Sequence, residues 1–282
     1  MNAELEELLE SLLYEGYALY PYTPGAVKNA TPTPFGIVYP PAYAAANPPA
    51  RDHLRMECVL EADPDAVVEA SVRFLQSSGA GHAAVERRIE LPRARLGELA
   101  DGGVGAEFAF GGEVRLRGRA RVRADSLGGG LTRLRVCVHN ATPSEPDWDR
   151  GAALAAGLLS THPVATTDGG RFRPAADHPE LESVNTWPVL ATDDDRTVLG
   201  AAVVLPDHPR LAPESRGSMF DGTEIEEALL LHVRTLSDGE RAAISEGDPA
   251  VRAMVERAAA AAPEDLVRLH GRVTIRDPED AA

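Results

Sequence analysis

Residues 113–140, EVRLRGRARVRADSLGGGLTRLRVCVHN, decide the fold that this sequence predicts. Apolar and polar residues alternate along 113–124 and again along 131–139, and a glycine-rich segment joins the two runs. Alternation with a period of two indicates strands that have one buried and one exposed face, and glycines suit the tight turn between them. We therefore expect a long β-hairpin.

Three more alternating runs precede the hairpin, at 54–60, 68–74 and 85–90. Several strands with one polar face predict an antiparallel sandwich or an open barrel. The sequence thus indicates an α+β protein with an antiparallel, β-sandwich-like central domain at 51–141. A helix and a Pro/Tyr-rich lap are expected at 1–50. A helical C-terminal half is expected at 150–282, with a boundary near 142–150.

The other expected elements follow from helical periodicity and from turn residues. In the N-terminal part, leucines at helical spacing predict a helix at 3–13, and short strands are expected at 17–22 and 35–39. In the C-terminal half the patterns predict a helix at 150–159, a loop region at 160–195, a strand at 197–205 and a helix at 222–236. Helical and acidic-turn signals then alternate over 238–246, 249–262 and 263–269.

Composition and charge narrow the class of protein. The 282 residues carry 44 acidic and 28 basic side chains, a formal net charge of −16, which argues against binding to nucleic acid or to an anionic membrane. No apolar run is long enough to span a membrane, and the acidic N-terminus does not resemble a secretory signal. Cys58 and Cys137 form no CxxC pair and are expected to be free, buried thiols. These features favour a cytoplasmic protein.

Arginine occupies every second position in the first strand of the predicted hairpin: Arg115, Arg117, Arg119, Arg121 and Arg123. They should project from one face of a strand, with two more arginines on the neighbouring strand. One interpretation is a surface for an anion or an acidic partner, with Arg117, Arg119 and Arg121 at its centre. The simpler and favoured interpretation is a lattice of cross-strand ion pairs with Glu57, Glu61, Glu69, Glu86 and Glu90.

All six tyrosines and the only lysine, Lys28, fall within residues 14–43. Tyrosine is enriched at interfaces, and a lone lysine in an arginine-rich chain indicates a position where a guanidinium would not serve. A docking face is therefore one hypothesis for this lap, and a segment packed over the sheet is the other. The residues of the predicted docking face are Tyr17, Tyr20, Tyr22, Lys28, Asn29 and Tyr39.

A metal site is the third hypothesis. Three His-Pro pairs supply His162, His178 and His208, and Asp221 and Glu224 could complete a zinc- or iron-type site. The spacing matches no established ligand motif, so loop histidines bonded to the backbone are the simpler interpretation. Asp221 and Glu224 also resemble a capping box at the start of a helix. Phosphate-binding loops and nucleophile motifs are absent from the sequence.

Two blocks resemble a bacterial family that is encoded beside nickel–iron hydrogenase genes. They are LYEGYALYPYTPGAVKNATPTPFGIVYPPAY (13–43), and WPVL (187–190) with LPDHPRLAPES (205–215) and MFDGTEIEE (219–227). After the Lys-Asn pair this chain departs from the family pattern with Ala-Thr-Pro-Thr at 30–33. The resemblance implies an accessory or assembly protein of hydrogenase biogenesis that binds a hydrogenase subunit or maturation factor. No catalysis and no cofactor are expected in that role.

Two alternatives remain open at this point. One is a metal-dependent enzyme or metallochaperone that uses a transition metal held by the His-Pro loops with Asp221 and Glu224. The other is an anion-binding β domain that uses the arginine face.

Overall fold

The computed structural model describes residues 3–14, 35–78, 84–211, 237–239, 242, 249–260 and 262. The helices are α1 (Ala3–Tyr14), α2 (Pro41–Ala46), α3 (Leu96–Asp101), α4 (Arg150–Ala155) and α7 (Pro249–Ala260), with a 3-10 helix η2 (Ala175–Asp177). The first strands are β1 (His53–Glu61), β2 (Val67–Ser77), β3 (Ala84–Glu90), β4 (Ala94–Arg95), β5 (Val104–Phe110) and β6 (Leu116–Gly128). The others are β7 (Leu131–Asn140), β8 (Leu159–Thr167), β9 (Arg171–Arg173), β10 (Trp187–Leu190) and β11 (Thr197–Ala201).

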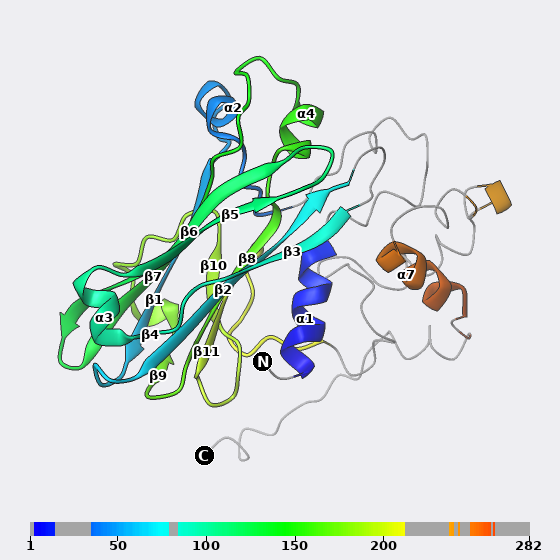
Figure 1. The fold of residues 1–282 in the computed structure, drawn as a ribbon. Helices are drawn as coiled ribbons and strands as arrows, with labels where there is room; N and C mark the ends of the chain where they lie inside the picture. The colour runs from blue at the N-terminus through cyan, green and yellow to red at the C-terminus, as the bar shows by residue number, and fades with distance from the viewer. Residues whose placement is uncertain are drawn as a thin grey trace.

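The strands form two antiparallel sheets (Figure 1). The first sheet has the order β5-β6-β7-β1-β9, and the second has the order β10-β11-β8-β2-β3, with β4 paired to β2. Met56 of β1, Val136 of β7 and Phe74 of β2 belong to one buried cluster that draws on both sheets. The expected sandwich-like antiparallel arrangement is therefore present in the described residues.

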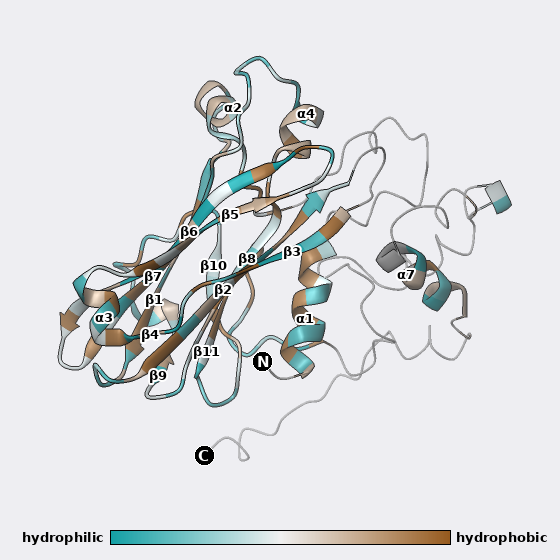
Figure 2. Ribbon diagram, viewed as in Figure 1, coloured by the Kyte–Doolittle hydropathy of each residue, from teal (hydrophilic) through white to brown (hydrophobic). Residues whose placement is uncertain are grey.

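The predicted hairpin is confirmed as β6 and β7, which pair from Gly118 with Asn140 to Gly128 with Leu131. Buried and exposed residues alternate along β6, and Figure 2 shows the matching alternation of hydropathy. Gly128, Gly129 and Gly130 all have positive φ angles, of 85°, 62° and 80°. Only glycine adopts such angles readily, so this turn is a direct consequence of the GGG sequence.

The helix expected at 3–13 is confirmed as α1. Its leucine stripe, including Leu5, Leu9 and Leu12, packs on Val164 of β8 and Leu199 of β11. Full burial of one leucine contributes about 1.5–3 kcal/mol, so this stripe is sufficient to fix α1 against the second sheet.

Two predictions, about a loop and a boundary, are wrong, and one strand was missed. The loop expected at 160–195 begins with β8, a central strand of the second sheet, and also contains β9 and β10. Pro163 obscured β8, because proline is rare inside central strands. The strand β5 was not predicted at all. The boundary expected near 142–150 does not separate two units, because each sheet combines strands from both sides of it.

The helical C-terminal half is also corrected where it is described. Residues 150–211 hold four strands and one α-helix, α4, which ends at Ala155 rather than at 159. Asp149 begins this helix, because its Oδ1 accepts a hydrogen bond from the Ala152 N–H at 2.8 Å. The helix α7 lies within 249–262, one of the segments over which helical and acidic-turn signals alternate, and the strand expected at 197–205 is confirmed as β11, which ends at Ala201.

Several expected features lie outside the described residues: the strand at 17–22, the helix at 222–236, the segment 263–269 and most of 238–246. The strand expected at 35–39 is described in full and is wrong: only Val38 pairs, in an isolated bridge with Leu158. Over the described residues, no helix is long and apolar enough to cross a membrane.

Candidate functional site

The outer face of the first sheet carries a row of exposed arginines on β6. We call Arg117, Arg119, Arg121 and Arg123 the arginine row; all four are exposed, whereas the residues between them are buried. The predicted projection of these side chains from one face is confirmed. Neighbouring members lie two residues apart, or ~6.7 Å, so that the row is about 20 Å long.

Beside the row, Glu57 of β1 organises a cluster of ion pairs. Its side chain is only 4% exposed, and its Oε1 accepts a hydrogen bond from Arg135 Nε at 2.8 Å. The Glu182 N–H donates to Oε2 at 2.9 Å, and Arg55 and Arg133 lie at 3.6 and 4.0 Å. Burial alone would raise the pKa of Glu57, but these hydrogen bonds and the charges of Arg135 and Arg55 outweigh it and lower the pKa.

A second cluster lies at the far edge of the same sheet, where Glu61 contacts two arginines of β9. Its Oε2 lies 3.1 Å from Arg171 Nε and 2.7 Å from Arg173 Nη2. On β7, Arg135 also pairs with Asp125. Cross-strand ion pairs are thus present among β1, β6, β7 and β9, but the lattice was predicted for the hairpin arginines, and for Arg117 to Arg123 that prediction is wrong.

The arginine row is not part of this lattice. Among the described residues, no carboxylate lies within 4.0 Å of Arg117, Arg119, Arg121 or Arg123. Arg121 instead donates from Nη2 to the carbonyl oxygen of Gly102 at 2.5 Å. Arg123 stands opposite another arginine, Arg135, in the register of β6 and β7. The row is therefore a cationic strip without a close ion pair on the described surface, although Glu107 of β5 stands opposite Arg119 in the register.

A neighbouring histidine reports the same positive environment. His139 of β7 stands opposite Arg119 and stacks on His53, with ring centroids 5.4 Å apart. Burial, and then the positive charges of Arg119 and His53, lower the pKa of His139. The His139 imidazole is therefore neutral at pH 7. The positive charge on this part of the sheet comes from the arginine row.

The tyrosine- and lysine-rich lap is described only in its last part. Tyr17, Tyr20, Tyr22, Lys28 and Asn29 lie outside the described residues. Tyr39 is 9% exposed, and its ring lies 5.2 Å from the ring of Tyr43. Burial raises the pKa of Tyr39. This tyrosine is a packed residue rather than an open contact residue.

The end of α1 and the first described residues of the lap both meet the start of β8. Ser160 donates from Oγ to the carbonyl oxygen of Leu12 at 3.0 Å, and its N–H donates to the carbonyl oxygen of Phe35 at 3.1 Å. The Thr161 N–H donates to the carbonyl oxygen of Gly36 at 3.1 Å. Ser160 has a φ of 49°, which a non-glycine residue adopts only when its surroundings hold it there.

The three histidines of the predicted metal site have separate partners. His162 is fully buried in β8, where Nδ1 lies 3.1 Å from the carbonyl oxygen of Gly200, and it is not a loop residue as expected. His178 contacts Glu180 at 3.0 Å, and His208 contacts Asp195 at 2.8 Å. In the described part of the chain, no group of three His, Cys, Asp or Glu side chains could hold a metal ion. Asp221 and Glu224 lie outside it.

Cys58 and Cys137 are free, as expected; Cys58 is buried and Cys137 is half-buried. Burial raises the pKa of both thiols, so they are protonated at pH 7. Neither has the lowered pKa that a reactive cysteine requires.

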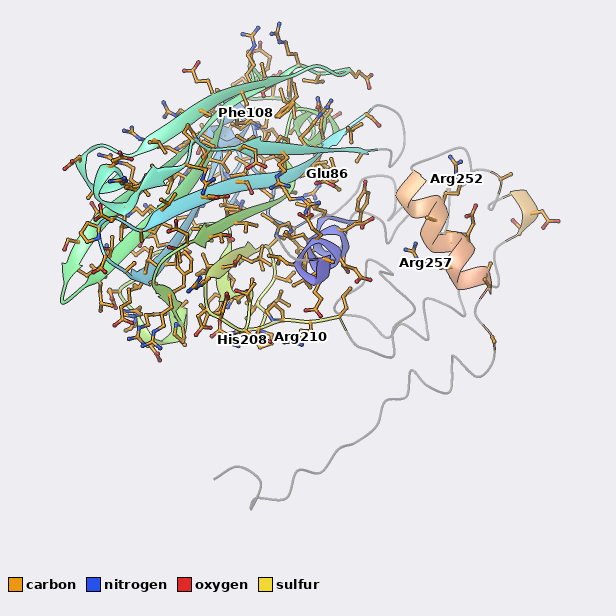
Figure 3. All side chains as sticks on the ribbon, turned by 60° about the horizontal axis from the view of Figure 1, so that its bottom comes forward. Glu86, Phe108, His208, Arg210, Arg252 and Arg257 are labelled. Carbon is orange, nitrogen blue, oxygen red and sulfur yellow. The ribbon has the colours of Figure 1, made fainter. Side chains whose placement is uncertain are left out.

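A cavity of about 830 Å³ lies between α1 and the segment after β11. Figure 3 shows His208 and Arg210 on that segment, below α1. Arg210 Nη2 binds both carboxylate oxygens of Asp193, at 2.5 and 2.6 Å, and His208 binds Asp195. These two charged pairs are used within the chain, whereas Glu4, Glu7, Asp168 and Arg196 also line the cavity.

Comparison with known proteins adds no identity. A scan against protein-family models gives no match to the chain. A search of curated proteins gives no match either. The function is therefore inferred from the sequence and from the geometry of the site.

Proposed function

We propose that this protein is a non-catalytic binding protein that docks an acidic partner on the arginine row. The observation that carries the proposal is the absence of carboxylates within 4.0 Å of Arg117, Arg119 and Arg123 on the described surface, in a chain of net charge −16. Four like charges at ~6.7 Å spacing repel one another, and a negative partner would relieve that repulsion.

The shape of the row favours a protein segment over a small anion. A small anion is held by donors that converge on one point, whereas these side chains are spread along about 20 Å of an exposed strand. Carboxylates on alternate residues of an extended segment would have the same spacing as the arginines. Arginine also binds carboxylates with two parallel hydrogen bonds, which makes such a contact specific.

The identity of the partner rests on the resemblance of the sequence to hydrogenase-associated proteins. We propose a nickel–iron hydrogenase subunit or maturation factor as the partner, and the cytoplasm as the place where the two meet. In this proposal the lap with Lys28 provides a second contact.

The test is a pull-down from the native host with tagged wild-type protein and two triple variants. The first variant, Arg117→Gln/Arg119→Gln/Arg123→Gln, removes charge from the row but keeps Arg121 and its bond to Gly102. The matched control, Arg88→Gln/Arg93→Gln/Arg95→Gln, removes three exposed arginines elsewhere.

Wild type and control should recover a hydrogenase subunit or maturation factor in equal amounts, and the row variant should recover at least tenfold less. Equal recovery by the two triple variants would show that the row is not the docking surface. Recovery of no hydrogenase protein by wild type would remove the proposed partner.

A further inference from the structure

The strand beside the arginine row, β5, is the edge of the first sheet. The Arg117 N–H donates to Thr142 Oγ1 at 3.0 Å, and its carbonyl oxygen accepts from the Ala141 N–H at 2.8 Å, both on the side away from β5. Backbone groups alternate in direction along a strand, so Gly118 and Ala120 bond to β5 through Phe108 and Ala106.

The intervening residues of β5 consequently direct their backbone groups away from the sheet. They are Gly105, Glu107 and Ala109, and within the described chain no strand pairs with this side of β5. The pairing of β5 with β6 contains no bulge, and the strand has neither proline nor lysine. Bulges, proline and charged side chains normally protect an edge from other chains, and the one charged residue of β5 is Glu107, so the backbone of this edge is open to pairing on the described surface.

The side chains of Arg121 and Arg123 extend toward that same edge, because Gly103, just before β5, and Gly105, on β5, leave space for them. A Cβ at Gly103 would lie 2.5 Å from Cγ of Arg123, and one at Gly105 would lie 3.4 Å from Cγ of Arg121. The bond from Arg121 to Gly102 confirms the direction, since Gly102 lies just before β5. A strand added to β5 would lie ~10 Å from β6. Because these two arginine side chains extend toward the edge, their guanidinium groups lie closer to the added strand than that backbone distance.

We propose that the partner contributes an extended acidic segment that pairs with the β5 edge as a sixth strand of the first sheet, with its carboxylates facing the arginine row. This inference rests on the proposed function and specifies how the partner binds. Backbone hydrogen bonds to Gly105, Glu107 and Ala109 would supply part of the affinity, and charge would select the partner.

The charges on this face argue against a second copy of the chain as the occupant. Two β5 strands paired with each other would place both arginine rows on one continuous face, where they repel. The one acidic side chain on the edge, Glu107, stands opposite Arg119 in the register. It would face any added strand, so it weakens but does not cancel the attraction of the four arginines for acidic residues.

The probe is a blocked, fluorescent heptapeptide that alternates glutamate and valine, and its affinity is measured by anisotropy. Two control peptides carry N-methyl groups on all glutamates or on all valines. Each control keeps the charge of the peptide but removes the N–H donors of every second residue. Methylated glutamates block antiparallel pairing and methylated valines block parallel pairing, so one of the two controls blocks pairing in either case. One methylated peptide should bind at least tenfold more weakly than the parent.

A protein variant provides the complementary test. Glu107→Pro removes an outward N–H, and proline is tolerated at strand edges that face solvent. It should weaken parent-peptide binding at least tenfold relative to Glu107→Gln, which removes the same charge and keeps the N–H. Circular dichroism of both variants checks that the sheet is retained.

The outcomes separate the two proposals. If both methylated peptides bind as tightly as the parent, while the row variant binds all three weakly, pairing with β5 is refuted and the charge-based docking surface stands. If the row variant binds every peptide as well as wild type does, both proposals fail.

Discussion

Replacement of Glu57 by glutamine should destabilise the first sheet, because this buried carboxylate joins β1, β7 and the segment around Glu182. Glutamine has the same shape but no charge, and one of its two polar atoms becomes a donor. Either Arg135 Nε or the Glu182 N–H, now at 2.8 and 2.9 Å from carboxylate oxygens, would then face an NH₂ group. Loss of one charge-assisted hydrogen bond costs about 1.5–3 kcal/mol, and the unpaired donor adds to this.

We expect a total loss of about 3 kcal/mol in the free energy of unfolding at pH 7. At about 2–4 °C for each kcal/mol, this corresponds to a fall in Tm of roughly 6–12 °C. Urea unfolding followed by circular dichroism measures the free energy directly. The matched control is Glu61→Gln, which removes a more exposed carboxylate from the same strand and should have a much smaller effect.

The effect should also depend on pH. The pKa of Glu57 is lower in the folded protein than its ordinary value of 4.5, so its stabilisation is complete above that value. It is lost as the pH falls through the folded pKa. The difference between wild type and Glu57→Gln should therefore shrink below pH 4.5. Equal stability of Glu57→Gln and Glu61→Gln at pH 7 would refute the reasoning.

Three further predictions concern the core. Burial lowers the pKa of His162 to about 4, so wild type should lose about 3 kcal/mol of stability between pH 6.5 and pH 4, and His162→Gln should flatten that window in urea titrations at several pH values. Asn140→Ala should cost about 2–4 kcal/mol in urea unfolding, because Asn140 Nδ2 donates to the carbonyl oxygens of Val38 and Ala156 at 3.0 and 2.8 Å. Leu9→Ala should lower the stability of the packed α1 by about 2–5 kcal/mol in thermal unfolding, whereas the exposed Glu10→Ala should be nearly neutral.

The hairpin was predictable because one face of β6 is charged and the other is apolar. Each arginine of β6 alternates with an apolar residue or glycine, and this pattern specifies both the strand and the exposed face. β5 has the same alternation, but its small residues and flanking glycines resemble a loop. β8 contains a proline, and only its position between β2 and β11 shows that the chain remains extended there.

The candidate site was only partly predictable for a related reason. The alternate positions of the arginines in the sequence place them on one face of the strand. They do not show which carboxylates lie close enough to form ion pairs with them. That depends on the pairing of β1 with β7, which places Glu57 opposite Arg135 across 78 positions of the chain. The distinction between the ion-paired arginines of β7 and the arginine row, which has no close ion pair on the described surface, therefore appears only in the folded sheet.

Tyr39 shows the same limit. Its tyrosine-rich surroundings suggested a contact residue, but the bridge between Val38 and Leu158 draws this part of the chain into the fold. The Tyr39 ring is consequently buried. Burial of this kind follows from long-range pairing, which local composition does not encode.

The most direct test of the central claim is the affinity of the acidic heptapeptide for three proteins, measured at low and at physiological salt. These are wild type, Arg117→Gln/Arg119→Gln/Arg123→Gln, and the control Arg88→Gln/Arg93→Gln/Arg95→Gln. If the arginine row is a docking surface, wild type and control bind equally, the row variant binds at least tenfold more weakly, and added salt narrows the difference. Equal affinity of the row variant and the control would contradict it.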